Sequence, residues 1–268
     1  PKLKVLNKQD LADPGRTGAW LAWYNARPAT CAIALDASDA APARRLIDAC
    51  RQLAPNRRGL SKPMRVLICG IPNVGKSTLI NTLSRKTQAK TGDEAGITKQ
   101  EQRIVLDDDF YLWDTPGMLW PRIIVPESGL RLAASGAMGR NAYDEEEVVL
   151  ELLAYLKQHY APLIDARYKL GLDAAAIAAK HDDELLQLIA RKRGAVMSGG
   201  RLNLQKAAEI VLTDLRSAAL GRVTLETPAE FEAWLAAAEV QENERAARKA
   251  EQLRRNERRA RNAPRDED

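Results

Sequence analysis

The chain has 268 residues, 45% of them hydrophobic and 29% charged, with a formal net charge of +5 and a pI near 9.1. A chain of this length can bury a core of about 150 residues and a second small domain. Its apolar runs are too short to span a bilayer and no leader-like segment begins at Pro1, so we expect a cytoplasmic protein without a membrane partner.

A polar tetrapeptide follows the first strand-like run, residues 3–6. Residues 7–10 read Asn-Lys-Gln-Asp. This order puts Asp10 at the carboxyl end of a strand, where open α/β sheets bind ligands. The Asp10 carboxylate matches the N1–H and N2–H₂ donors of guanine, which adenine lacks. Asn7 would brace the loop and the stem of Lys8 would lie over the base; an ordinary polar loop is the alternative.

The central motif is a phosphate-binding loop of the form Gly-x4-Gly-Lys-Ser at residues 70–77. It stands between a strand-like run, residues 64–69, and a helix start at residues 77–84, which is the context this motif requires. Lys76 would bridge the β- and γ-phosphates, and Ser77 would place its hydroxyl on Mg²⁺. The remaining expected nucleotide contacts in this loop are Asn73, Val74, Gly75 and Thr78. The alternative is another Gly-rich strand-to-helix turn.

Two further elements suit a nucleotide switch. Thr98 lies in a polar loop and would close on Mg²⁺ and the γ-phosphate. Runs 102–106 and 110–113 predict a hairpin turned at 107–109, and Asp-Thr-Pro-Gly follows at 114–117. Asp114 would hold Mg²⁺ through water, and Gly117 would offer its N–H to the γ-phosphate; a plain turn after a strand is the alternative. We therefore take Lys76, Thr98 and Gly117 as the catalytic candidates.

The second half of the chain is helical in period from Asp144 onward. Thr227, Pro228 and Glu230 predict a capping box that begins a last helix. Residues 245–261 carry eight Lys or Arg against two Glu, which predicts a solvated tail. We expect a nucleotide domain at 1–126, a connector at 127–143, a helical domain that binds RNA or the ribosome at 144–226, and a basic tail at 227–268.

The order of these motifs is permuted, because Asn-Lys-x-Asp usually follows the phosphate loop. In this order, and in residues 129–136, 199–208, 214–217 and 220–226, the chain resembles the YlqF/RbgA-type ribosome-assembly GTPases. The resemblance implies a circularly permuted P-loop GTPase of the α/β class, with a Ras-like sheet and flanking helices, followed by a small all-α domain. It also implies an N-terminal strand and a catalytic His ahead of Pro1. Ala34 and Leu35 would form the loop that closes over guanine, although a Ser-Ala-Lys-like turn is commoner there.

The same resemblance implies a GTP-binding and GTP-hydrolysing factor that assembles the large ribosomal subunit. Ribosomal RNA is the expected partner, because the basic tail is joined by a second basic cluster that comprises residues 191–193, Arg201, Lys206, Arg216 and Arg222. GTP or GDP and Mg²⁺ are the expected ligands, and Asn73 is a candidate K⁺ ligand or simply suits a tight turn. We expect a monomer.

Met118 favours a second function. It stands after Asp-x-x-Gly, where many GTPases place a water-orienting Gln, and a thioether cannot polarise water. The alternative is a ribosome- or RNA-binding module that uses GTP structurally with negligible turnover.

Neither Cys nor His is expected to take part in chemistry. Cys31, Cys50 and Cys69 are odd in number and lack a Cys-x-x-Cys pair, so we expect buried reduced thiols. His159 and His181 fall in the helical part and are expected to be ordinary helix residues.

Overall fold

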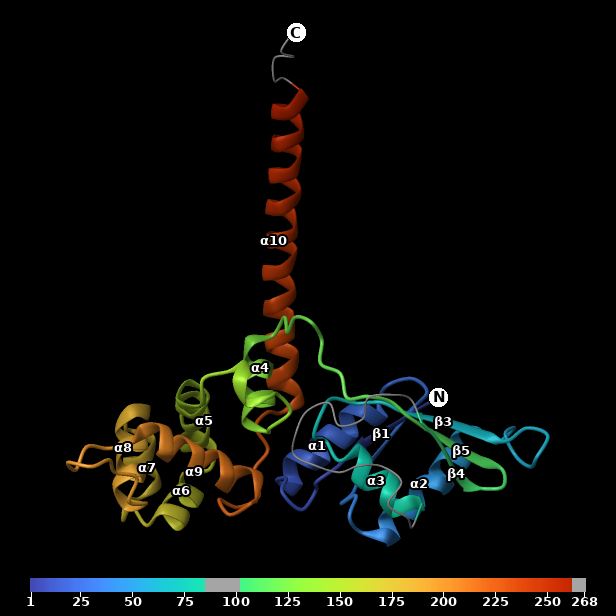
Figure 1. Cartoon of the computed structure of the whole chain (residues 1–268), viewed down its shortest axis with the longest axis horizontal. Coiled ribbons are helices and arrows are strands. Elements are labelled where there is room, and N and C mark those ends of the chain that lie inside the picture. Colours follow the sequence, from blue (N-terminus) through green and yellow to red (C-terminus); the bar gives the residue numbers. More distant parts are fainter. Residues whose placement is uncertain (85–101, 262–268) are drawn as a thin grey trace.

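The first part of the chain alternates strands and helices. The computed structural model describes residues 1–84 and 102–261 (Figure 1). The elements of this part are β1 (Lys2–Leu6), α1 (Pro14–Asn25), β2 (Thr30–Ala34), α2 (Ala40–Leu53), β3 (Met64–Ile68), α3 (Lys76–Ser84), β4 (Gln102–Asp107) and β5 (Phe110–Asp114). The expected hairpin is confirmed, because β4 and β5 pair antiparallel.

The described strands form two sheets that share a core. β1 pairs parallel with β2, and β3 pairs parallel with β5. Leu35 and Leu79 are buried in one cluster, against which Val5 of β1 and Ile68 of β3 also pack. Helix α3, which follows the phosphate loop, therefore contacts both sheets and fixes the carboxyl ends of β1 and β3 near each other.

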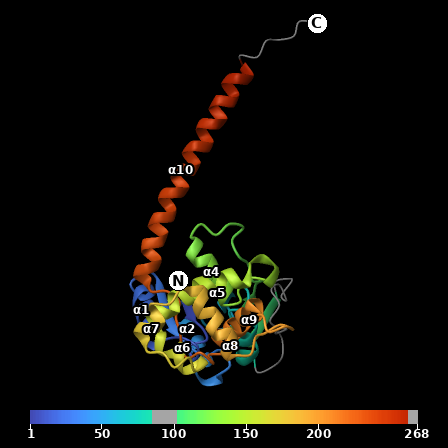
Figure 2. The ribbon, with the colours of Figure 1, turned by 90° about the vertical axis from the view of Figure 1, so that its left-hand side faces the viewer.

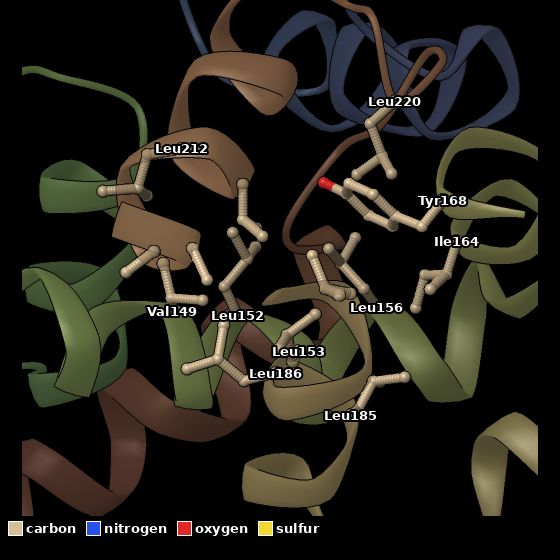
Figure 3. Packing of buried hydrophobic residues seen from close by; sticks show 14 of the residues in the cluster. Val149, Leu152, Leu153, Leu156, Ile164, Tyr168, Leu185, Leu186, Leu212 and Leu220 are labelled. Atoms are coloured by element: carbon tan, nitrogen blue, oxygen red, sulfur yellow. The ribbon is translucent and has the colours of Figure 1, made fainter. Parts of the chain in front are cut away.

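The second part is helical. Its elements are α4 (Pro126–Ala134), a 3-10 helix (Arg140–Ala142), α5 (Glu145–His159), α6 (Ala161–Tyr168), α7 (Ala174–Ala178), α8 (Asp182–Lys192), α9 (Leu204–Arg216) and α10 (Pro228–Arg261). Side chains of α5, α6, α8 and α9 meet in one apolar core (Figure 3). Leu153, Leu156 and Leu186 are fully buried there. Each such side chain contributes about 1.5 to 3 kcal/mol through burial.

Polar side chains fix the helix starts. Asp144 accepts hydrogen bonds from the main-chain N–H groups of Glu146 and Glu147 at 2.8 and 3.0 Å and caps α5. The capping box of α10 is confirmed: Glu230 accepts from Thr227 N at 2.6 Å, and Thr227 Oγ1 accepts from Glu230 N at 3.3 Å. These bonds satisfy N–H groups that a helix leaves unpaired at its start.

Helix α4 packs with the helical part. Ala133 and Ala134, near its end, belong to the same core as α5 and α9. Most of α4 falls within residues 127–143, the segment expected to be a connector. We therefore propose that the helical domain begins at Pro126 and that only the residues between β5 and α4 connect the two domains.

Helix α10 begins against the nucleotide domain and then projects outward (Figures 1 and 2). Phe231 packs on Trp20 and Trp23 of α1, with ring centroids 6.0 and 6.1 Å apart. Its residues 245–254 are exposed. No helix within residues 1–84 or 102–261 is long and apolar enough to cross a membrane.

One expectation about the cysteines is wrong. Cys31 and Cys50 are half-buried, but Cys69 is exposed. Cys69 follows the last residue of β3, so it lies at the start of the phosphate loop rather than in the core. All three are free thiols, as expected.

Candidate nucleotide-binding site

Asn7 joins two motifs that lie far apart in the sequence. Its amide Nδ2 donates to Val74 O in the phosphate loop at 2.8 Å, and its Oδ1 accepts from Ala37 N, also at 2.8 Å. One side chain thus ties together the loops that follow β1, β2 and β3. These loops lie at the carboxyl ends of their strands, where α/β sheets bind ligands.

The phosphate loop needs glycine at position 75. Gly75 has φ +89°, and a Cβ there would lie 2.2 Å from Asn7 Nδ2. No L side chain fits this space without moving Asn7. Asn73 also has a positive φ, +59°, which Asn tolerates better than most residues. The tight curl of this loop turns its N–H groups inward, and the N-terminus of α3 adds a dipole that favours an anion.

Lys76 extends into the centre of the loop that would hold the phosphates. Its Nζ donates to Ile71 O at 2.7 Å and to Gly70 O at 3.1 Å. Burial lowers the pKa of Lys76, while the nearby Asp114 and Cys69 act in the opposite direction. A cation held this way lacks full hydration, so an incoming phosphate would meet a poorly solvated positive charge.

Gly117 lies against the same lysine. A Cβ at Gly117 would lie 2.9 Å from Lys76 Nζ and 2.9 Å from Pro72 Cα. The chain after β5 therefore approaches the phosphate loop so closely that only glycine fits. This approach puts residue 117 beside the position expected for the terminal phosphate.

The residues present suit a magnesium ion shared with phosphates. Asp114 is only 1% exposed and lies near Lys76, and Ser77 is in the first turn of α3. Within residues 1–84 and 102–261 no three His, Cys, Asp or Glu side chains cluster into a metal cage. Mg²⁺ at nucleotide phosphates needs no such cage, since one carboxylate and one hydroxyl complement the phosphate oxygens and water.

The base side of the site differs from our interpretation of the second loop. Ala34 is the last residue of β2, and the side chain of Leu35 is fully buried in the core. Leu35 contributes only its carbonyl, which accepts from Gln9 N at 3.2 Å. The Ala34 and Leu35 assignment is therefore corrected to the turn at residues 36–38, where Ala37 N meets Asn7.

A sequence signal for that turn existed. Asp36 Oδ1 accepts from Ser38 N at 2.8 Å, which is an Asx turn of the kind that Asp-x-Ser favours. Lys8, with φ +58°, and Asp10 are exposed beside this turn, as a base-reading pair must be before a ligand binds.

Two other candidates have different outcomes. Asn73 Nδ2 donates to Gly136 O at 2.8 Å, so the phosphate loop contacts the end of α4. Thr78 lies in the first turns of α3. Thr98 lies outside the described residues, and its proposed role stays a prediction.

The second basic cluster is smaller than expected. Arg216 donates to the carbonyls of Ala133 and Ala134, both at 2.8 Å, and Arg222 donates to those of Gln9 and Ala12. These two guanidinium groups join parts of the protein instead of facing an anionic partner. The exposed members of the cluster are Arg191, Lys192, Arg193, Arg201 and Lys206.

Known proteins resemble the chain over most of its length. A family model for 50S ribosome-binding GTPases matches residues 65–193. Ribosome biogenesis GTPase A of Bacillus cereus is 38% identical over 238 residues, which cover 86% of this chain and 78% of that protein. GDP-bound TM YlqF is 26% identical with a TM-score of 0.58, and the match covers 85% of this chain and 83% of the other. GNP-bound YlqF from Thermotoga maritima is 25% identical with a TM-score of 0.57, over 85% and 82% of the two chains.

Proposed function

The chain belongs to the ribosome biogenesis GTPase A family and is a GTPase of ribosome assembly, and from this premise we propose that it acts on the large ribosomal subunit. The proposed reaction is hydrolysis of GTP to GDP and phosphate. The observation that carries the proposal is the bridge from Asn7 to Val74 O and Ala37 N, because it assembles base-reading and phosphate-binding loops into one site.

Each loop has a proposed task in binding. Asp10 accepts the N1–H and N2–H₂ groups of guanine, the stem of Lys8 covers the base, and Ala37 closes the far side. Residues 73–78 enclose the phosphates with their N–H groups, and Lys76 contacts the β- and γ-phosphates. The YlqF relatives with GDP and GNP bound support this assignment.

The catalytic part is proposed to be electrostatic. Ser77 and Asp114, with Thr98, would hold Mg²⁺, which neutralises charge on the phosphates when bound. Gly117 offers its N–H to the terminal phosphate, and Lys76 stabilises the charge that develops on the oxygens during transfer. Asn73 is the proposed K⁺ contact.

Water activation needs a further group. Met118 is 71% exposed and its thioether cannot orient water. We therefore expect slow turnover by the protein alone and faster turnover on the subunit, which would order a competent group. Met118 also supports the alternative, a ribosome-binding module that holds GTP structurally and hardly turns it over.

The partner surface is proposed on the helical half. Arg191, Lys192, Arg193 and Arg201 are exposed on or near α8, and the outer half of α10 adds further positive charge. Such groups bind phosphates and release counterions, so ribosomal RNA is the proposed contact. Action on the ribosome places the protein in the cytoplasm, and we propose a monomer.

A phosphate-release assay tests this function. We expect low GTP turnover alone, a marked increase with large subunits, and loss of both in Lys76→Ala. Turnover that large subunits leave unchanged would contradict the proposal and support the structural use of GTP.

A further inference from the structure

A segment of the helical half lies along the base-reading loop. This segment, residues 220–226, connects α9 to α10 and is here named the strap. Val223 N donates to Leu11 O at 2.9 Å, and Asp13 N donates to Thr224 Oγ1 at 3.0 Å. The strap therefore contacts the loop that begins with Asn7 and ends at the cap of α1.

Arg222 makes the two contacts of the strap that lie closest to the base-reading residues. Its Nη2 donates to Gln9 O at 2.7 Å and its Nε donates to Ala12 O at 2.8 Å. Gln9 and Ala12 flank the turn that carries Asp10. A guanidinium is planar and rigid, so two bonds from one fork fix the distance and the orientation between these carbonyls.

The loop depends on such support from outside. Lys8 has φ +58°, a conformation that a non-glycine residue keeps only when its surroundings hold it. Within the turn, Leu11 N donates to Lys8 O at 3.0 Å, and Ala12 N reaches Gln9 O only at 3.4 Å. The shorter bond to Gln9 O comes from Arg222.

The strap itself is anchored on the helical domain. Gly221 has φ +113°, and a Cβ there would lie 3.0 Å from Leu163 of α6. Tyr160 OH, from the junction of α5 and α6, accepts from Thr224 N at 3.2 Å. Arg222 is thus held at a fixed place by the helical core.

We propose that Arg222 is a positioning residue for base recognition, which holds the turn of Asp10 in its guanine-binding geometry from the helical domain. The inference rests on the proposed role of Asp10. Its consequence is reciprocal: because Arg222 stabilises the loop that binds guanine, a bound nucleotide stabilises the contact between loop and strap. The helical domain and α10, which follows the strap, would sense the nucleotide from its base side.

A double-mutant cycle on GDP affinity tests the proposal with the full chain. The variants are Asp10→Ala, Arg222→Ala and the double variant, with GDP dissociation constants measured by calorimetry. We expect Arg222→Ala to weaken GDP binding about tenfold, as for loss of one charge-assisted interaction. In the Asp10→Ala background the same change should have almost no further effect, because the group that Arg222 positions is gone.

Two further variants separate positioning from general stability. Lys157→Ala is the matched control, since Lys157 also donates to a main-chain carbonyl, Lys180 O at 2.8 Å, but lies within the helical domain. It should lower the melting temperature without changing GDP affinity. Arg222→Lys, which keeps the charge and one donor group, should restore part of the affinity.

The outcomes are distinct. Additive losses from Asp10→Ala and Arg222→Ala would show that Arg222 acts only on the fold, and would overturn the inference while leaving the base site intact. Unchanged GDP affinity in Asp10→Ala would refute the proposed base site, and the inference would fall with it.

Discussion

Replacing Gly75 by Ala should damage the site through two separable effects. The backbone at φ +89° costs an L residue about 1 to 2 kcal/mol. The new Cβ would also lie 2.2 Å from Asn7 Nδ2, so Asn7 must leave its place. Its bonds to Val74 O and Ala37 N are then lost, at about 1 kcal/mol each. The total destabilisation is about 3 to 4 kcal/mol.

The chain offers a matched control at Gly59. Gly59 has a similar φ, +70°, but a Cβ there would meet nothing within 4 Å. Gly59→Ala should therefore cost only the strain of about 1 to 2 kcal/mol. Since 1 kcal/mol shifts the melting temperature of a chain this size by about 2 to 4 °C, Gly75→Ala should melt several degrees below Gly59→Ala.

Nucleotide binding decides between the effects. We expect GDP affinity by calorimetry to be unchanged in Gly59→Ala and strongly reduced in Gly75→Ala, because Asn7 no longer joins the three loops. Equal melting temperatures for the two variants, or full GDP affinity in Gly75→Ala, would refute the reasoning.

Three other predictions concern the ion, the tail and a buried carboxyl. If K⁺ contacts Asn73, parent turnover on subunits should be faster in KCl than in NaCl at equal ionic strength and alike in Asn73→Ala; identical parent rates would remove the ion. A chain ending at Glu244 should keep its GDP affinity, bind large subunits more weakly, and show a log affinity against log salt slope flatter by about 0.7 to 0.9 per lost phosphate contact. An unchanged slope would leave the exposed arginines of α8 as the contact. Burial raises the pKa of Glu226 above its ordinary 4.5, so the folded state binds the proton more tightly than the unfolded chain. Ionised Glu226 thus lowers stability at pH 7, and Glu226→Gln should raise the melting temperature there, with the gain vanishing below about pH 4.5; a lower melting temperature at pH 7 would show that the Arg131 pairing prevails.

Local sequence signals predicted the elements that form the site. The β4 and β5 hairpin and the capping box at Thr227 depend on neighbouring residues, and both are present in the structure. The requirement for glycine at residue 75 also follows from the motif, because the tight loop needs a positive φ there.

Contacts between distant segments were not predictable in the same way. Leu35 was taken for a base contact, although its side chain completes the core, because a strand end in the sequence does not show which face is buried. Arg216 and Arg222 were counted as RNA-binding charge, whereas both bond carbonyls more than 80 residues away in the chain. Composition cannot distinguish a free guanidinium from one that joins two domains.

The subunit-stimulated turnover of GTP and XTP by the parent chain and by Asp10→Asn is the measurement that tests the account most directly. An amide at residue 10 donates where guanine N2–H₂ also donates but matches the xanthine carbonyl, so nucleotide preference should change by about 1.5 to 3 kcal/mol. The account predicts that large subunits stimulate the parent with GTP and the variant with XTP. Parent turnover without stimulation, or a variant that keeps its preference for GTP, would contradict it.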